Sequence, residues 1–98
     1  MSGYVLTITA AKLPEGAGVA VTDAFRQVTR QLPHMVLHTF LIKEGRDDWR
    51  IVTLWRSREQ LEEYRREAGV PAAIKIFRDA GAEPTVTEHD VEHWASSG

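Results

Sequence analysis

The segment from Trp49 to Glu67, WRIVTLWRSREQLEEYRRE, constrains the fold of this chain more than any other segment. Its first part is rich in β-branched and aromatic residues on both side-chain parities, which favours a strand buried on both faces. After Trp55 the pattern changes to charged residues with apolar positions at helical spacing. Ser57, followed by a glutamine three residues later, is typical of a helix N-terminus. The segment therefore predicts a strand over residues 49–56 that leads directly into a helix over residues 58–68.

The remaining stretches of the chain also match strand or helix patterns. A β-branched run near the N-terminus ends at the turn sequence LPEG, which predicts a first strand. The next stretch has apolar residues at helical spacing up to Pro33, and the helix ends there because the residue before proline disfavours helical geometry. The sequence predicts strands over residues 4–12, 35–42, 49–56 and 85–94, and helices over residues 17–32, 58–68 and 71–80.

This order of elements is that of a ferredoxin-like split βαβ domain with one added helix. We expect a single α+β domain over residues 1–98, with the helices on one face of an antiparallel four-stranded sheet. The second strand is apolar on both parities: Met35, Leu37 and Leu41 on one, Val36, Phe40 and Ile42 on the other. A solvated second face would then expose a larger apolar patch than soluble monomers carry. The sequence therefore predicts a homodimer in which two sheets pack face to face.

Composition and spacing argue against several classes of function. The net charge is −2, so the chain lacks the basic excess of a dedicated nucleic-acid binder. The sequence has no cysteine and no apolar run of membrane-spanning length, which together predict a cytoplasmic protein without disulfides or thiolate metal sites. His89 and His93 fall on a predicted strand, where they would lie about 13 Å apart, too far to share a metal ion.

Two stretches, IVTLWRSREQLEEYRRE and PAAIKIFRDAGAEPTVTEHDVEH, resemble domains of the antibiotic-biosynthesis monooxygenase type, and the resemblance extends over nearly the whole chain. It implies a dimeric α/β barrel, in which two ferredoxin-like sheets pack together. The superfamily includes cofactor-free oxygenases of polyketide quinols, haem-degrading monooxygenases, quinol monooxygenases, cyclases, decarboxylase-like isomerases and proteins of no known activity. The resemblance therefore implies the fold more specifically than the chemistry.

The haem-degrading branch of this superfamily is tested by three positions. It uses an asparagine, a tryptophan and a haem-ligating histidine, which correspond here to Thr9, Tyr64 and about Ala73. All three residues differ, and the position of the proximal ligand has no side chain able to bind iron. The sequence therefore argues against haem degradation, and we expect no cofactor.

The cofactor-free branch implies a dry aromatic pocket, a group that hydrogen-bonds a substrate oxyanion, and a route for a proton. Its substrate would be a small aromatic, quinol or polyketide-like molecule. The candidate catalytic residues are Tyr64 and His38. The candidate substrate-binding residues are Thr9, Thr7, Trp55, Phe77, Phe25 and Phe40.

Each of these residues also has a purely structural interpretation. Tyr64 can be a tyrosine at the edge of the core whose hydroxyl reaches water. His38 can be a histidine packed in the core or in an interface, and Trp55 can anchor the core or an interface. Two further functions remain open on the same scaffold: a non-catalytic ligand-binding or accessory dimer, and a cyclase, isomerase or decarboxylase that needs no oxygen.

Overall fold

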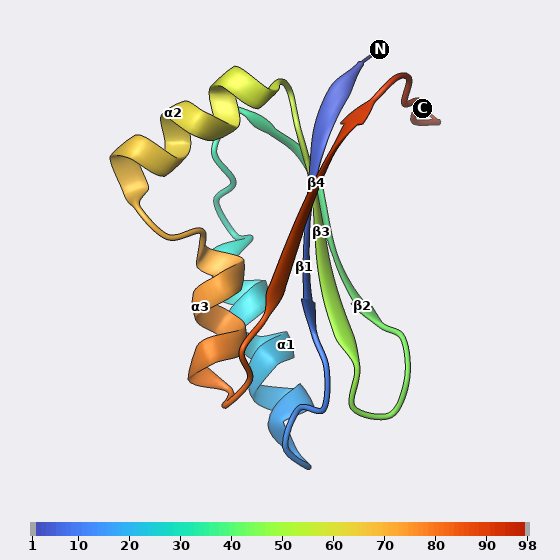
Figure 1. The fold of residues 1–98 in the computed structure, drawn as a ribbon, viewed down its shortest axis with the longest axis vertical. Helices are drawn as coiled ribbons and strands as arrows, with labels where there is room; N and C mark the ends of the chain where they lie inside the picture. Colours follow the sequence, from blue (N-terminus) through green and yellow to red (C-terminus); the bar gives the residue numbers. More distant parts are fainter. Residues whose placement is uncertain (1, 98) are drawn as a thin grey trace.

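The computed structural model describes residues 2–97, which form four strands and three helices (Figure 1). In chain order these are β1 (Gly3–Ala10), α1 (Ala17–Val28), β2 (Val36–Lys43), β3 (Trp49–Trp55), α2 (Arg58–Ala68), α3 (Ala72–Asp79) and β4 (Thr85–Val91). The strands form one antiparallel sheet in the order β2-β3-β1-β4. This is the predicted α+β, ferredoxin-like arrangement, and the fold prediction is confirmed.

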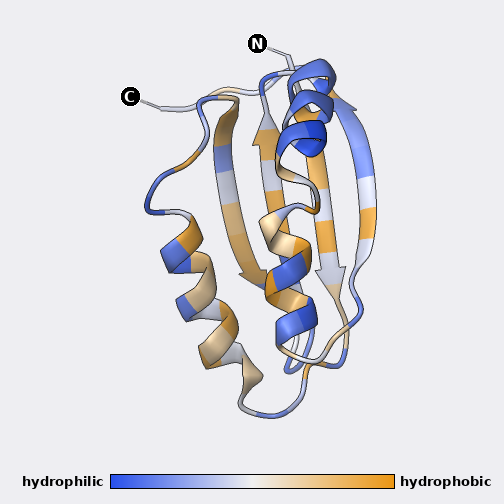
Figure 2. Cartoon of the chain, turned by 90° about the vertical axis from the view of Figure 1, so that its left-hand side faces the viewer, coloured by the Kyte–Doolittle hydropathy of each residue, from blue (hydrophilic) through white to orange (hydrophobic). Residues whose placement is uncertain are grey.

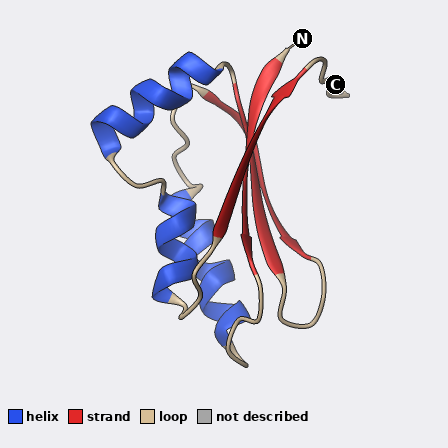
Figure 3. Ribbon diagram, in the orientation of Figure 1, coloured by secondary structure: helices blue, strands red, loops and turns tan. Residues whose placement is uncertain are grey.

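All three helices cover the same face of the sheet and leave the other face without a covering layer (Figure 3). In β1 the even-numbered residues, from Tyr4 to Ala10, are buried under the helices, and the odd-numbered ones are half-buried on the open face. Figure 2 views the sheet from its covered side, with apolar colour along the strands and mostly hydrophilic colour along α2. The covered face therefore contains the core of the protein.

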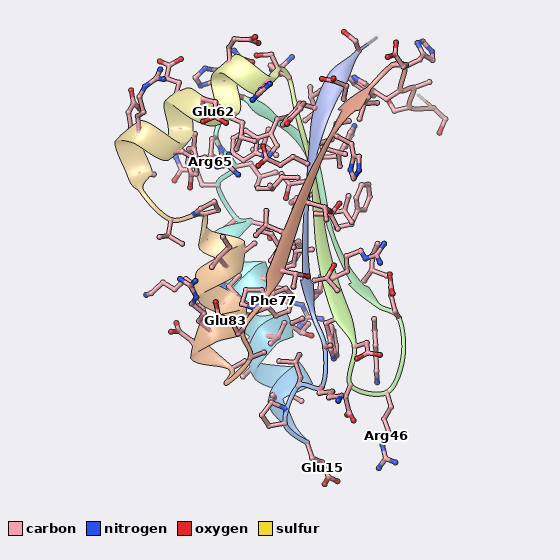
Figure 4. All side chains as sticks on the ribbon, viewed as in Figure 1. Glu15, Arg46, Glu62, Arg65, Phe77 and Glu83 are labelled. Atoms are coloured by element: carbon pink, nitrogen blue, oxygen red, sulfur yellow. The ribbon has the colours of Figure 1, made fainter. Side chains whose placement is uncertain are left out.

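The core joins the sheet to α3 and α1. Phe77 of α3 is fully buried, as is Leu61 of α2, and Val21 of α1 is nearly so. Figure 4 shows Phe77 between α3 and the strands. Burial of a side chain as large as phenylalanine contributes about 1.5–3 kcal/mol to the free energy of unfolding.

Helix α2 begins and ends as the predicted helix over residues 58–68 does. The hydroxyl of Ser57 accepts a hydrogen bond from the backbone N–H of Gln60 at 3.1 Å, which satisfies one of the free donors of the first turn. Gly69 ends the helix with a positive φ of 78°, a conformation that glycine adopts without strain. None of the helices within residues 2–97 has the length and apolar character needed to cross a bilayer.

Three other elements end two or more residues before the predicted end. Helix α1 ends at Val28 rather than at residue 32. Just after this end, the hydroxyl of Thr29 donates a hydrogen bond to the carbonyl oxygen of Phe25 at 2.7 Å. Strand β1 stops at Ala10, and Lys12 beyond it has a left-handed φ of 58°. Strand β4 ends at Val91, rather than continuing to residue 94.

Strand β2 contains an irregularity between Val36 and His38, where the register against β3 shifts by one residue. Val36 pairs with Trp55 of β3, and His38 pairs with the adjacent Leu54. Leu37 therefore has no partner of its own in β3 and is the extra residue of a β-bulge. The predicted grouping of Val36 with Phe40 is therefore wrong. The bulge places Val36 on the covered face and Phe40 on the open one.

Candidate functional site

A cavity of about 220 Å³ lies between the covered face of the sheet and the three helices. Strands β1, β2 and β3 form its floor, and the end of α1, the middle of α2 and the start of α3 form its walls. The aromatic and polar residues that line it are Phe25, Thr39, Thr53, Trp55, Tyr64 and Thr29, with Gln31 at the segment after α1. The rest of the lining is aliphatic or proline, so the cavity is predominantly apolar.

Trp55 is the most informative residue of this cavity. It ends β3, only 4% of it is exposed, and its ring centroid lies 5.2 Å from that of Tyr64 on α2. Its indole Nε1 is buried and meets no hydrogen-bond acceptor among residues 2–97. A buried donor without a partner costs about 1–3 kcal/mol, so such a group in a native protein calls for a physical explanation.

Two threonine hydroxyls form the other polar feature of the cavity floor. Thr39 of β2 and Thr53 of β3 are paired across the two strands, and their Oγ1 atoms lie 3.0 Å apart. One hydrogen bond between two hydroxyls uses one of their two hydrogens, so the second hydrogen can be donated to another acceptor. The floor of the cavity can therefore bind a ligand oxygen.

Charged groups do not reach this cavity. Within residues 2–97 its lining contains no His, Cys, Asp, Glu, Lys or Arg side chain. The same part of the chain has no group of three His, Cys, Asp or Glu residues placed to hold a metal ion. Burying an isolated charge in such surroundings is costly, which favours an uncharged ligand.

A network of polar side chains lies beside the cavity, between α2 and the edge of the sheet. The hydroxyl of Tyr4 donates to Oε1 of Glu88 at 3.1 Å, and Nη2 of Arg65 binds Oε2 of Glu88 at 3.2 Å. Arg65 also binds Glu62, one turn back along α2, at 3.0 Å. Figure 4 labels Arg65 and Glu62 on α2. The network ties the helix to β4 and β1.

The network shifts the pKa values of two of its members. Burial raises the pKa of Tyr4, and the hydrogen bond to Glu88 together with the negative charge of Glu88 raises it further. For Glu88, burial acts to raise the pKa, but the hydrogen bonds and positive charge of Arg65, helped by the hydrogen bond from Tyr4, outweigh it and hold the pKa below its ordinary value. Glu88 is therefore held in its charged form.

The structure brings three of the eight predicted site residues together. Tyr64, Trp55 and Phe25 all line the cavity. Phe77 does not line it, because its ring is fully buried in the core beneath α3. The expectation that Phe77 forms a wall of the same pocket is therefore corrected.

The other four predicted residues lie on the open face of the sheet. Thr7 and Thr9 are odd-numbered residues of β1 and point away from the helices, as side chains alternate along a strand. His38 and Phe40 follow the bulge in β2 and pair with Leu54 and Val52, which also face away from the helices. These four residues are thus separated from Tyr64 by the sheet, and one common pocket is not formed.

Sequence reasoning missed Thr39 and Thr53. Both are threonines at positions that share a strand face with buried Ile51, and they pair across β2 and β3. A polar residue on an apolar stripe is the signal that points to them. That signal becomes readable only once the register of β2 is known.

Comparisons with known proteins place this geometry among solved folds. A haem-degrading protein from Mycobacterium tuberculosis, in a haem-free cleaved form, aligns over 97% of this chain and 98% of its own, with 21% identity and a TM-score of 0.60. A second structure of the same protein, MhuD, with two haems bound in its active site aligns over 94% of this chain and 99% of its own, with 24% identity and a TM-score of 0.62. The chain shares their fold.

Other comparisons add little about chemistry. A conserved protein from Methanosarcina mazei aligns over 89% of this chain and 91% of its own, with 7% identity and a TM-score of 0.66. No protein-family model matches the sequence, and a search of curated proteins finds no significant match. Likeness at these identities establishes the fold, so function has to be argued from the site itself.

The cavity of this chain does not fit a haem. Haem iron is held by His, Cys, Met or Tyr side chains, and the lining within residues 2–97 offers none of the first three. Ala73 lines the cavity at the position expected for the proximal ligand, and Tyr64 packs against Trp55. The volume of about 220 Å³ is below the roughly 300–1,000 Å³ of pockets for drug-sized ligands. Among residues 2–97, no cationic side chain lines the cavity to bind haem carboxylates.

Proposed function

We propose that this chain binds a small, uncharged, electron-rich aromatic compound in the cavity and oxygenates it as a cofactor-independent monooxygenase. The observation that carries the proposal is the indole of Trp55: this residue lines the apolar cavity, and its buried N–H has no hydrogen-bond acceptor among residues 2–97. A phenol or quinol oxygen at hydrogen-bonding distance would satisfy this donor. The aromatic walls supplied by Phe25 and Tyr64 suit the ring that carries such an oxygen.

The size of the cavity favours a single substituted ring. An apolar cavity of about 150 Å³ in another protein accommodates benzene. The cavity here, at about 220 Å³, leaves room for a ring with one or two small substituents. A cavity of this size suits a one-ring quinol better than a polycyclic polyketide.

The proposed reaction needs no external reductant. A quinol that loses a proton gives an electron-rich anion that donates to O₂ and forms a C–O bond at a ring carbon next to an oxygen-bearing one. The ring peroxide then loses water and gives a hydroxyquinone. One oxygen atom enters the product, the other leaves as water, and the quinol supplies all four electrons.

The residues of the cavity would assist this reaction in three ways. A hydrogen bond from Trp55 would stabilise the anionic form of the bound quinol and so offset part of the cost of burying its charge in an apolar cavity. The hydroxyl of Tyr64 stands at the wall as a relay for the proton. The apolar lining keeps water from the peroxide. His38 is assigned no role in this site, because it lies on the open face.

The test measures O₂ consumption by metal-free protein with methyl- and methoxy-hydroquinones, and ¹⁸O₂ incorporation into the product. We expect one labelled oxygen atom per product, and Trp55→Phe to lower kcat/KM about tenfold to a hundredfold, because a hydrogen bond to a charged group is worth about 1.5–3 kcal/mol. Trp49→Phe is the control, since Trp49 does not line this cavity. Equal activity in the wild type and Trp55→Phe would contradict the proposal.

A second candidate function is ligand binding without chemistry. The observation that favours it is the lack of any acid or base that ionises near neutral pH in the described lining of the cavity. Thermal stabilisation by the same hydroquinones without O₂ consumption would support this candidate. Turnover with label incorporation would rule it out.

The proposal includes a homodimer formed through the open face of the sheet. On that face Phe40 is 54% exposed and Ile42 39% exposed, next to half-buried Val5, Val52 and Leu54. A second copy covering this surface would remove these side chains from water. Light scattering at micromolar concentration should give twice the chain mass, and Phe40→Glu should give the mass of one chain. A wild-type mass of one chain would contradict this part of the proposal.

A further inference from the structure

The polar network beside the cavity belongs to a closed ring of contacts that runs through the proposed site. Glu88 of β4 binds Arg65 of α2 and accepts a hydrogen bond from Tyr4 of β1. Tyr4 is the cross-strand partner of Trp55, and the ring of Trp55 packs on Tyr64, the residue before Arg65. This closed set of contacts therefore links Trp55 and Tyr64, two aromatic residues of the cavity, to the carboxylate of Glu88 at the edge of the sheet.

Helix α2 has few other means of holding its orientation. Leu61 is its one buried residue, and most of its surface is charged. Gly69, in a left-handed conformation, separates it from α3. A helix that contacts the core through Leu61 and the half-buried Tyr64 can rotate more easily than one with several buried residues, unless a further contact with the sheet prevents it. The pair between Arg65 and Glu88 is such a contact.

We propose that Glu88 is a positioning residue that fixes the orientation of α2 and thereby holds Tyr64 against Trp55 at the cavity. Both carboxylate oxygens of Glu88 face Arg65, because Nη1 lies 3.4 Å from Oε1 and Nη2 lies 3.2 Å from Oε2. A pair with two hydrogen bonds fixes an angle as well as a distance. This geometry restrains the rotation of the helix.

Glu62 provides a matched comparison within the same network. It binds the same arginine at 3.0 Å, but it lies on α2 itself, so this pair moves with the helix and does not orient it relative to the sheet. The two carboxylates thus differ in whether they connect the helix to the sheet. Of the two carboxylates, only the loss of Glu88 should release Tyr64.

The other charged groups near Glu88 have to be included in any pH experiment. Arg65 and Arg58 of α2 favour its charged form, and Tyr4 of β1 donates a hydrogen bond to it. Glu62 competes for Arg65, and the charge of Asp90 on β4 acts on Tyr4. Because the pKa of Glu88 is lowered, the contact should persist at neutral pH and open only when acid protonates this carboxylate.

The composition of the chain allows a direct spectroscopic test. The sequence contains two tyrosines, Tyr4 and Tyr64, and both belong to the ring of contacts. Labelling with 3-fluorotyrosine therefore gives two ¹⁹F resonances, which Tyr4→Phe and Tyr64→Phe assign. We expect Glu88→Gln to shift or broaden the Tyr64 resonance and Glu62→Gln to leave it in place. An unchanged Tyr64 resonance in Glu88→Gln, or an equal change in Glu62→Gln, would overturn the proposal.

A stability measurement and a second variant separate positioning from unfolding. Thermal unfolding should show that Glu88→Gln remains folded at the temperature of the spectra. Arg65→Lys keeps the charge but loses the two parallel hydrogen bonds, so it should reproduce the Tyr64 shift. A folded Arg65→Lys protein with a wild-type Tyr64 resonance would count against the proposal.

The effect on ligand binding rests on the proposed function and is measured separately. We expect Glu88→Gln to weaken binding of methylhydroquinone about two- to fivefold, the effect of losing a partly exposed ion pair, with Glu62→Gln unchanged. If the wild type binds no hydroquinone, the proposed function fails while the ¹⁹F result still decides the role of Glu88. A Tyr64 shift without weaker binding would show that the orientation of α2 does not control the site.

Discussion

The two faces of the sheet are built from the same strands and differ in what covers them. In β3, Ile51, Thr53 and Trp55 face the helices, whereas Arg50, Val52 and Leu54 face the open side. The covered face contains the core and, among the described residues, a cavity without charged groups, whereas the open face mixes polar residues with exposed apolar ones such as Phe40 and Ile42. Strands that are apolar on both sides can thus form a core on one side and present apolar side chains to solvent on the other, and it is this exposed set that the proposed homodimer would cover.

The largest expected difference between the faces is in stability. Ile51→Ala removes a side chain that is 1% exposed and should lower the free energy of unfolding by about 2–5 kcal/mol. Val52→Ala, on the neighbouring residue of the open face, should cost less in a dilute sample, because Val52 is half-buried. Denaturant unfolding at several protein concentrations measures both. If a second copy covers the open face, the cost of Val52→Ala grows with concentration. Equal costs at every concentration would contradict the distinction between the faces.

A smaller effect is expected from the threonine pair of the cavity floor. Thr53→Val leaves the hydroxyl of Thr39 without its partner and should cost about 1 kcal/mol, whereas the double variant Thr39→Val/Thr53→Val should be closer to the wild type. Thr7→Val, on the open face, should change stability by less than about 0.5 kcal/mol. Chemical unfolding of the wild type, Thr39→Val, Thr53→Val and the double variant completes the cycle, and Thr7→Val is the control on the open face. Additive costs for Thr39 and Thr53 would show that the two hydroxyls are not coupled.

The smallest effect is the pH dependence that Glu88 contributes at the rim of the covered face. Its pKa is lower in the folded chain than in the unfolded one, so its contribution to stability is present above the unfolded pKa and is lost as the pH falls through the folded one. The contribution should be below about 1 kcal/mol, because the pair is partly exposed to solvent. The stability difference between the wild type and Glu88→Gln should therefore shrink in acid, below about pH 4. A difference that stays constant from pH 7 to pH 3 would contradict this assignment.

Much of this fold follows from local sequence rules. Ser57 predicts the start of α2 because its side chain caps a backbone donor, and Gly69 predicts its end. The aliphatic residues of β1 and β3 predict strands, and the order of elements predicts the topology. These features depend on neighbouring residues in the chain, which is why sequence alone is sufficient for them.

The candidate site depends on longer-range information. Trp55 and Tyr64 were predicted as parts of an aromatic pocket between the sheet and the helices, and they meet because β3 leads into α2 within a few residues. Thr9 and His38 could lie on either face of the sheet, depending on where the helices pack. The sequence does not identify that face, because the strands are apolar on both sides. The face of Phe40 further depends on the bulge at Leu37, which no local residue preference marks.

The bulge in β2 also bears on how this protein can change over time. The strand on either side of Leu37 keeps its own alignment with β3, so the segment that ends at Val36 and the segment that begins at His38 are positioned independently. Deletion of Leu37 would leave Val36 opposite Trp55 and Thr39 opposite Thr53, because the bulge contains one residue more than regular pairing needs. Related chains with or without the extra residue can therefore present the same two β2 side chains, Val36 and Thr39, to the cavity.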